Sequence, residues 1–449
     1  MISSNTENDH EQMNGNIQNC LQQLLTDLQL DDAPAGGALV VYRAGKCIAQ
    51  ASVGMAQIDK PWQPDTLSLN FSTGKGVLAT LTHILVSKQL LDYDTPIAHY
   101  WSEFATNGKA DITLRTLMLH QADLFAISSI DADSETLLDW QAMKDKVVAM
   151  TPTRTDQYEN YESAYSALVY GWILGALIEI VTDMSLAKAL RYYLTEPLGV
   201  ADSVYFGMPA DKANDVAKLV KDFEVSNEEG SQLRNKRHKP TLRADSEQTL
   251  HTYAQLPNYE CWQQMVETRK LAPANTPLNA TQINRLYFDH SAINASNYRA
   301  ALVPANKQPI DYYNLQTMQA IIPAANGVAS AYALATIYAM LANGGRWEDK
   351  ILIDAATFAE LSTPQVAGMD AVMPAPMNWR LGYHRLFSLC TDINTGFGHM
   401  GYNGSVAWCE PTRKLSFAFV HNFDVTMLND IRQFALTEAL LEMVDKANS

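Results

Sequence analysis

The stretch TLSLNFSTGKGVL at residues 66–78 decides the fold of this chain. A helix is predicted to begin at Ser72, because apolar residues from Val77 to Leu91 recur at helical spacing. Ser72 and Lys75 are three residues apart and therefore share one face of that helix, within hydrogen-bond reach of each other. The helix N-terminus offers unpaired N–H groups and positive potential, which favour an alkoxide and an oxyanion. The stretch is therefore compatible with a serine that a lysine activates, although the S-x-x-K pattern often occurs by chance.

Two other interpretations of this stretch need to be weighed. Gly74-Lys75 suggests a phosphate-binding loop, but Leu69 and Gly76 occupy positions where that motif needs glycine and Ser/Thr, so we reject it. The second alternative stays open at this point: Ser72 is a plain N-cap followed by a surface lysine.

Two later segments carry residues that suit a site. Tyr165 precedes an apolar helix rich in small residues, where it is also compatible with an ordinary core aromatic. The segment GFGHMGYNGS at residues 396–405 is dense in glycine beside a predicted strand, which allows a backbone to approach a ligand closely. It contains His399, which taken alone is more typical of a structural histidine.

Strand patterns occur at both ends of the chain and helical patterns between them. The predicted strands are residues 36–42, 46–53, 379–383, 404–408 and 415–421, and a closing helix covers 431–444. This order predicts one sheet built from residues 1–70 and 320–449. Residues 71–319 then form an inserted helical domain, which includes a variable and largely irregular insertion at about 211–320.

Composition excludes several classes of protein. The chain has 449 residues, 47% of them hydrophobic, and its 33 Lys+Arg against 49 Asp+Glu give a net charge of −16. Such an acidic chain repels nucleic acids and anionic membranes. No apolar run approaches the roughly 20 residues that span a bilayer.

The cysteines and the first residues indicate a cellular location. The five cysteines are Cys20, Cys47, Cys261, Cys390 and Cys409. Their number is odd and no two of them form a CxxC pair. This predicts reduced thiols and argues against both a zinc site and a disulfide framework. No basic residue precedes Arg43, and the first residues lack an apolar leader segment. Together these features predict a cytoplasmic protein.

Taken in order, the three segments resemble the serine β-lactamase/penicillin-binding-protein superfamily, and most closely its class C-like branch of β-lactamase-related hydrolases and family VIII carboxylesterases. Three more segments carry the same resemblance: ITLRTLMLHQADL at 112–124, residues 171–186, and PAANGVASAYALATIYAMLANGG at 323–345. The resemblance implies a β-lactamase/DD-peptidase-like fold of α/β plus all-α class. Its antiparallel sheet is flanked by helices, and the site lies at the junction with the helical domain.

The resemblance also implies a role for each matching residue. Ser72 is the acylated nucleophile, and Lys75 is the general base or holds the network that activates Ser72. Tyr165 shares the proton with Lys75 and needs neighbouring cations to act as a phenolate. The backbone N–H groups of Ser72 and Tyr402 form the oxyanion hole.

His399 and Gly401 match the third motif, which contacts the substrate. His399 stands where typical β-lactamases have lysine, and as a partly charged group it holds a carboxylate less firmly. Ala167 stands in place of the asparagine of Tyr-x-Asn, and so removes an amide that contacts the substrate.

A second tyrosine competes with Tyr165 for the middle motif. Tyr158-Glu159-Asn160 literally spells Tyr-x-Asn, but it lies seven residues too early. Tyr165 has the family's distance to Gly171 and Gly175, so Tyr165 is favoured.

The predicted function is a serine hydrolase that cleaves short-chain carboxylic esters through an acyl-enzyme on Ser72. A cytoplasmic location, His399 and Ala167 all favour esters over cell-wall or β-lactam substrates. The alternatives are a β-lactamase or D-amino-acid peptidase, an acyltransferase, and a binding or regulatory protein that has lost turnover. No metal or organic cofactor is implied, the expected partner is a small ester or amide, and the oligomeric state is left open.

Overall fold

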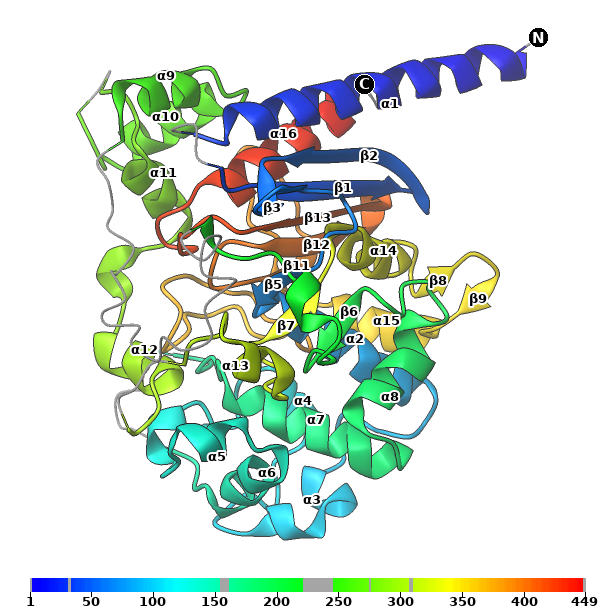
Figure 1. The fold of residues 1–449 in the computed structure, drawn as a ribbon, viewed down its shortest axis with the longest axis vertical. Helices are drawn as coiled ribbons and strands as arrows, with labels where there is room; N and C mark the ends of the chain where they lie inside the picture. Colours follow the sequence, from blue (N-terminus) through cyan, green and yellow to red (C-terminus); the bar gives the residue numbers. More distant parts are fainter. Residues whose placement is uncertain are drawn as a thin grey trace.

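The two ends of the chain meet in one antiparallel sheet (Figure 1). The computed structural model describes residues 2–30, 34–153, 161–220, 245–273, 276–306 and 310–446, with side chains from residue 14 on. The six strands run in the order β10-β11-β12-β13-β1-β2. They are β1 (Gly37–Arg43), β2 (Lys46–Val53), β10 (His384–Arg385), β11 (Phe397–Met400), β12 (Val406–Glu410) and β13 (Leu415–His421). Because β1 pairs with β13, Gly37 lies opposite His421.

The β1–β2 hairpin is confirmed, with Ala44 and Gly45 both at positive φ in the turn that the sequence predicted. The free edge of β2 is covered by α1 (Ile2–Asp27). The Gln18 side chain donates to Gln50 O at 2.7 Å and accepts from Gln50 N at 2.8 Å. A helix thus satisfies backbone groups that an exposed strand would offer to another chain.

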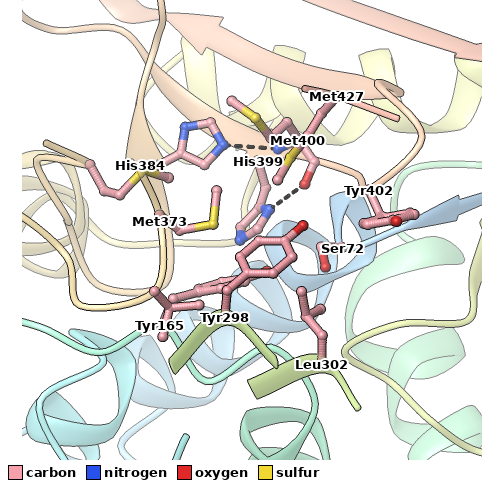
Figure 2. A pocket seen from close by; sticks show the side chains of 12 residues that line it. Ser72, Tyr165, Tyr298, Leu302, Met373, His384, His399, Met400, Tyr402 and Met427 are labelled. Carbon is pink, nitrogen blue, oxygen red and sulfur yellow. Dashed lines mark hydrogen bonds between the residues drawn. The ribbon is translucent and has the colours of Figure 1, made fainter. Parts of the chain in front are cut away.

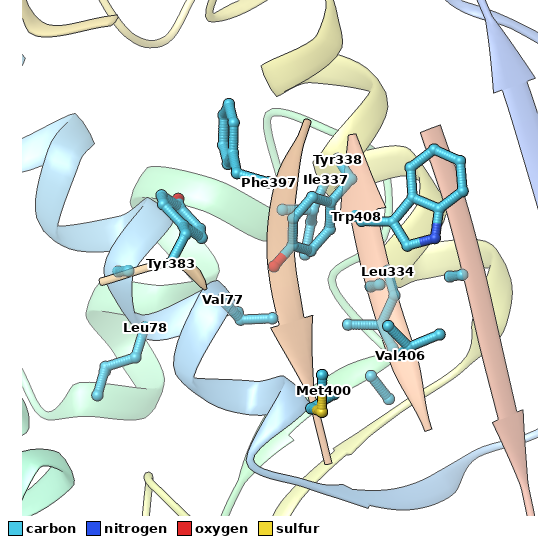
Figure 3. Close-up of a cluster of buried hydrophobic side chains, with 14 of the residues drawn as sticks. Val77, Leu78, Leu334, Ile337, Tyr338, Tyr383, Phe397, Met400, Val406 and Trp408 are labelled. Atoms are coloured by element: carbon cyan, nitrogen blue, oxygen red, sulfur yellow. The ribbon is translucent and has the colours of Figure 1, made fainter. Parts of the chain in front are cut away.

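Helices cover both faces of the sheet. On one face lie α2 (Thr73–Ser87) and α14 (Ala331–Ala342), and on the other lies α16 (Arg432–Lys446). Figure 3 shows Val77 of α2, Ile337 of α14 and Phe397 of β11 in one cluster of buried side chains, and all three residues are at most 1% exposed. This packing fixes the start of α2 relative to β11, the two elements that carry Ser72 and His399.

The remaining helices form the lower part of the molecule and one flank (Figure 1). Those that follow α2 are α3 (Ile97–Tyr100), α4 (Leu114–Met118), α5 (Ser134–Leu138), α6 (Trp140–Ala149), α7 (Val169–Thr182) and α8 (Leu186–Leu190). Those later in the chain are α9 (Glu247–Ala254), α10 (Tyr259–Thr268), α11 (Ala280–Tyr287), α12 (Ala295–Leu302), α13 (Leu315–Gln319) and α15 (Ala355–Ser362). None of the described helices is long and apolar enough to cross a membrane.

A small second sheet positions the start of α2. Its strands are β5 (Ser68–Phe71), β7 (Gly327–Ala329) and β6 (Val204–Phe206), with β7 in the middle and antiparallel to both. Two minor hairpins complete the strands, β3 (Met55–Gln57) with β4 (Lys60–Pro61) and β8 (Arg346–Trp347) with β9 (Lys350–Ile351). Because β5 runs directly into α2, its pairing with β7 holds the strand-to-helix junction in place.

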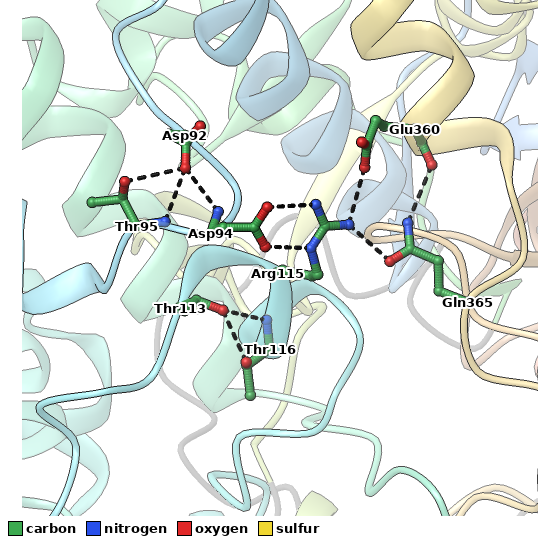
Figure 4. A network of polar contacts seen from close by, with 8 residues as sticks. All are labelled: Asp92, Asp94, Thr95, Thr113, Arg115, Thr116, Glu360 and Gln365. Atoms are coloured by element: carbon green, nitrogen blue, oxygen red, sulfur yellow. Dashed lines mark hydrogen bonds and ion pairs between the residues drawn. The ribbon is translucent and has the colours of Figure 1, made fainter.

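Arg115, from the ITLRTL segment, links three parts of the chain (Figure 4). Its guanidinium donates to both carboxylate oxygens of Asp94, at 2.6 and 3.0 Å. It also donates to Glu360 at 3.0 Å and to Gln365 at 2.9 Å. Such a planar, forked contact is specific to arginine, and it ties α4 to the end of α15.

Two local predictions are wrong. Residues 379–383 form a tight turn with Gly382 at a φ of +79° instead of a strand, and the short strand β10 follows it. Segment 397–400, which we interpreted as a glycine-rich approach to a strand, is itself strand β11. Residues 211–320, predicted as irregular connection with short helices, hold five short α-helices among their described residues.

The cysteine prediction also needs correction. Cys261 of α10 and Cys390 form a disulfide, with Cα atoms 6.1 Å apart, whereas Cys20, Cys47 and Cys409 are free. The sequence distance of 129 residues gave no signal for this pairing. Disulfides persist mainly in oxidising compartments, so the cytoplasmic location stays a prediction without the support of reduced thiols.

Candidate active site

The backbone presents Ser72 at the point where β5 becomes α2. Phe71 has a φ of +50°, a conformation that bulky residues rarely adopt. Ser72 follows as the N-cap of α2, yet its side chain makes no capping hydrogen bond. The alternative of a plain N-cap serine is therefore excluded, because the hydroxyl faces Lys75 instead of the helix N–H groups.

Lys75 lies under Ser72 and is fully buried. Its Nζ is 2.9 Å from Ser72 Oγ, 2.7 Å from Ala167 O and 2.6 Å from Ala324 O. Carbonyl oxygens only accept, so the two carbonyl contacts occupy two N–H bonds of the amine. In a neutral amine, the remaining lone pair then points at the Ser72 hydroxyl.

Burial decides the protonation of Lys75. Loss of hydration lowers the pKa of the amine well below its usual range. Its hydrogen-bond partners among the described residues are a hydroxyl and two carbonyls, so no carboxylate there opposes this shift. The close approach of α7 to Ala324 brings the second carbonyl to the amine. A Cβ on Gly171 would lie 2.4 Å from Ala324 N, so only glycine allows this contact.

Tyr165 is brought to the same point from the start of the α7 segment. It hydrogen-bonds with Ser72, and its ring lies 5.0 Å from Lys75 Nζ. The ring stacks on Trp379 at 5.6 Å, and the Tyr165 N–H donates to buried Asp370 at 3.1 Å. Burial raises the pKa of Tyr165, which is therefore a protonated phenol in this site.

The turn after β11 lies against β5. A Cβ on Gly401 would lie 2.3 Å from Asn70 O, so the missing side chain of Gly401 lets the turn approach the junction. Gly401 itself is absent from the pocket lining, whereas Tyr402 is part of it and packs 5.9 Å from the Phe71 ring. The roles of Ser72 and Tyr402 as oxyanion-hole donors stay a prediction.

A largely apolar pocket opens beside Ser72 and encloses about 420 Å³, counting space open to solvent (Figure 2). Its lining consists of Ser72, Tyr165, Tyr298, Leu302, Val372, Met373, Met377, His384, His399, Met400, Tyr402 and Met427. Tyr298 and Leu302 belong to α12, inside the segment whose function the sequence did not reveal. A single tyrosine or leucine on a short helix carries no motif, so no sequence signal identifies them.

His399 reaches the pocket from β11 and is only 2% exposed. Its pKa lies well below the usual range, first because of burial and then because His384, Lys75 and His120 are nearby. The expectation of a partly charged His399 is therefore wrong, since the site keeps this imidazole neutral at physiological pH.

The remaining predicted positions are placed as follows. Ala167 is buried and contributes its carbonyl to Lys75, and it is absent from the pocket lining. Tyr158 and Asn160 lie outside the described residues. In the described part of the chain, no group of three or more His, Cys, Asp or Glu side chains is arranged to hold a metal ion.

Comparisons with known proteins show the family of the chain. Residues 18–441 match the family model described as Beta-lactamase. The chain is 31% identical, over 86% of its length and 77% of the relative, to a Mycobacterium tuberculosis protein named Esterase/beta-lactamase LipL.

Two solved structures share the fold, and the predicted fold class is thereby confirmed. A penicillin-binding protein homologue from Caulobacter crescentus is 25% identical, with a TM-score of 0.67 and coverage of 95% of this chain and 97% of the other. A family VIII carboxylesterase is 22% identical, with a TM-score of 0.70 and the same coverage. The match to the family model and the relative together show that the chain belongs to the beta-lactamase family and is a serine hydrolase.

Proposed function

We propose that this enzyme cleaves carboxylic esters with short acyl chains through a covalent acyl-enzyme on Ser72. The observation that carries the proposal is the position of Lys75 Nζ, held by two carbonyls and 2.9 Å from Ser72 Oγ. Burial lowers the pKa of this amine well below its usual range, so it gives up its proton more readily than an exposed lysine and can serve as the base.

In the acylation step, Ser72 Oγ attacks the ester carbonyl carbon while its proton moves to Lys75 Nζ. The oxyanion of the tetrahedral intermediate would accept hydrogen bonds from the backbone N–H groups of Ser72 and Tyr402. Collapse breaks the bond to the alcohol oxygen, which takes the proton from Lys75 and leaves as the alcohol. Lys75 is then neutral again and ready for the second step.

In the deacylation step, a water molecule attacks the acyl-enzyme and Lys75 accepts its proton. Collapse returns that proton to Ser72 Oγ and releases the carboxylic acid. Tyr165 is a phenol at this point, so we assign it the relay of protons between Lys75, Ser72 and the leaving group, and exclude a role as phenolate base.

The pocket supports esters over β-lactams. None of its twelve lining residues is an acid, a lysine or an arginine, and His399 is neutral. The β-lactam antibiotics carry a carboxylate, which this lining would desolvate without a compensating charge. The lining includes four methionines, whose flexible side chains adapt to different apolar groups.

Mass spectrometry of the intact protein tests the proposal. After brief exposure to p-nitrophenyl butyrate, we expect a butyryl adduct on the peptide that contains Ser72. A separate exposure to a cephalosporin should give little or no adduct. Ester turnover with an adduct on a different residue, or no ester turnover at all, would refute the assignment.

A further inference from the structure

One ring nitrogen in the pocket has no hydrogen-bond partner. His399 lies on β11, and its Nδ1 is 2.9 Å from Met400 O (Figure 2). Its Nε2 is buried and contacts no donor or acceptor among the described residues. Buried polar atoms are rarely left unpaired, and an exception beside a candidate catalytic serine indicates a contact that the ligand completes.

The hydrogen-bond partner of His399 Nδ1 shows which of the two ring nitrogens carries the hydrogen. Met400 O is a carbonyl oxygen and only accepts, so Nδ1 carries the hydrogen. The imidazole is neutral chiefly because burial lowers its pKa well below the usual range. Nε2 therefore presents a lone pair and acts as a hydrogen-bond acceptor.

The neighbouring histidine does not supply a donor to Nε2. His384 Nδ1 pairs with Arg385 O at 2.7 Å, and its Nε2 accepts from Met400 N at 2.9 Å. Both ring nitrogens of His384 are thus engaged with backbone atoms. Most other lining residues are methionine, leucine or valine, which have no hydrogen-bond donor.

We propose that His399 Nε2 accepts a hydrogen bond from the substrate, so that the enzyme selects uncharged esters carrying an O–H or N–H group near the scissile bond. This inference rests on the proposed function. A carboxylate at the same place only accepts hydrogen bonds, and its negative charge is repelled by the lone pair of Nε2. Esters that carry a carboxylate there are therefore rejected. A role of His399 as base for water is disfavoured, because this imidazole binds a proton weakly.

Matched esters test the proposal, with kcat/KM measured by pH-stat titration. The hydroxyl group lies either in the alcohol part, as in 2-hydroxyethyl butyrate, or in the acyl part, as in propyl 3-hydroxybutyrate. Propyl butyrate is the reference for both, and 2-carboxyethyl butyrate tests the charge. We expect one hydroxyl ester to exceed the reference by about 10-fold or more, and the carboxylate ester to be the slowest.

Variants of His399 show whether Nε2 is the cause. His399→Leu removes the acceptor and should bring the ratio of hydroxyl ester to reference near one. His399→Gln places an amide oxygen near the same point and should keep part of the preference. His399→Lys should raise turnover of the carboxylate ester relative to the reference. Because each result is a ratio within one protein, a general loss of activity does not alter its meaning.

The outcomes separate this inference from the proposed function. If the enzyme turns over esters but neither hydroxyl ester has a higher kcat/KM than propyl butyrate, the selection by His399 is overturned and the esterase assignment stays intact. A preference that persists in folded His399→Leu overturns it as well. If that variant does not fold, the ratios of the parent and of His399→Gln decide. Absence of turnover for every ester overturns both proposals.

Discussion

Lys75 Nζ lies 2.9 Å from Ser72 Oγ, one turn further along the same helix, and both atoms also approach the carbonyl oxygen of Ala324. A second fully buried lysine provides a contrast. Lys109 Nζ contacts three carbonyls, those of Thr106, Val148 and Met150, and so uses all three N–H bonds of an ammonium. Lys75 has only two carbonyls, and its third contact is the Ser72 hydroxyl.

Ser72→Ala should abolish ester turnover and leave the fold intact. The Ser72 side chain makes no capping bond to α2, so its loss costs little stability. A fluorophosphonate probe should label the parent protein at Ser72 and leave the variant unlabelled. Labelling of the variant, or retention of full activity, would contradict the assignment of the nucleophile.

Lys75→Met should change how stability depends on pH. In the unfolded chain Lys75 keeps its proton up to about pH 10.5, whereas burial releases it at lower pH in the native state. Unfolding therefore takes up a proton between these two pKa values, and native stability rises with pH in that window by up to ~1.4 kcal/mol per pH unit. Urea unfolding at pH 7, 8 and 9 should show this rise in the parent and its loss in the variant.

Lys109→Met is the matched control for that measurement. The pKa of Lys109 is lowered as well, but less than that of Lys75, and Lys109 is not part of the proposed site. Its substitution should leave most of the pH dependence and the ester turnover in place. An equal effect of both substitutions would mean that Lys75 is not unusual in its protonation.

Tyr165→Phe should lower kcat by roughly 10²–10⁴-fold, the usual contribution of a positioned proton-transfer group. The phenylalanine ring keeps the stacking on Trp379, so Tm should change little. Tyr158→Phe is the control and should have almost the same kcat as the parent.

The double variant Lys75→Ala with Tyr165→Phe should have a kcat little lower than either single variant, because the effects of groups that act as a unit are not additive. An inactive Tyr158→Phe with an active Tyr165→Phe would reverse the assignment.

Short-chain esters should be hydrolysed much faster than β-lactams. The pocket has no charged lining residue to bind a carboxylate, and Ala167 offers no side-chain amide. The measurement compares kcat/KM for p-nitrophenyl butyrate and nitrocefin at one pH. Equal or faster cleavage of nitrocefin would show that the apolar lining does not determine the preference.

Arg115→Leu should lower the free energy of unfolding by about 1 kcal/mol, because Arg115 joins Asp94, Glu360 and Gln365 in one network. The side chains are partly exposed, which limits the effect. Ester turnover should stay unchanged, since the network lies outside the site. A double-mutant cycle with Asp94→Ala should give a coupling energy well above zero if the paired contact is real in solution.

The sequence predicted the fold and the proximity of Ser72 and Lys75 because both depend on local patterns. Ser72 and Lys75 are three residues apart on a helix, and the β1–β2 hairpin has its own turn residues. Contacts between residues that are far apart in the sequence leave no such local pattern. Tyr298 and Leu302 reach the pocket from α12, and Cys261 meets Cys390 across 129 residues. The neutrality of His399 also depends on its surroundings, which sequence spacing does not describe.

The pairing of β1 with β13 has a consequence for synthesis of the protein. Gly37 leaves the ribosome long before its partner His421 is made, because the two residues are far apart in the sequence. Until then the β1–β2 hairpin has no neighbour on its inner edge, and Ser72 lacks the turn that carries Tyr402. A nascent chain therefore holds the proposed nucleophile without the rest of the proposed site, and long-range pairing of this kind folds slowly. Under the proposed function, we expect ester hydrolysis to begin only after β13 has paired with β1.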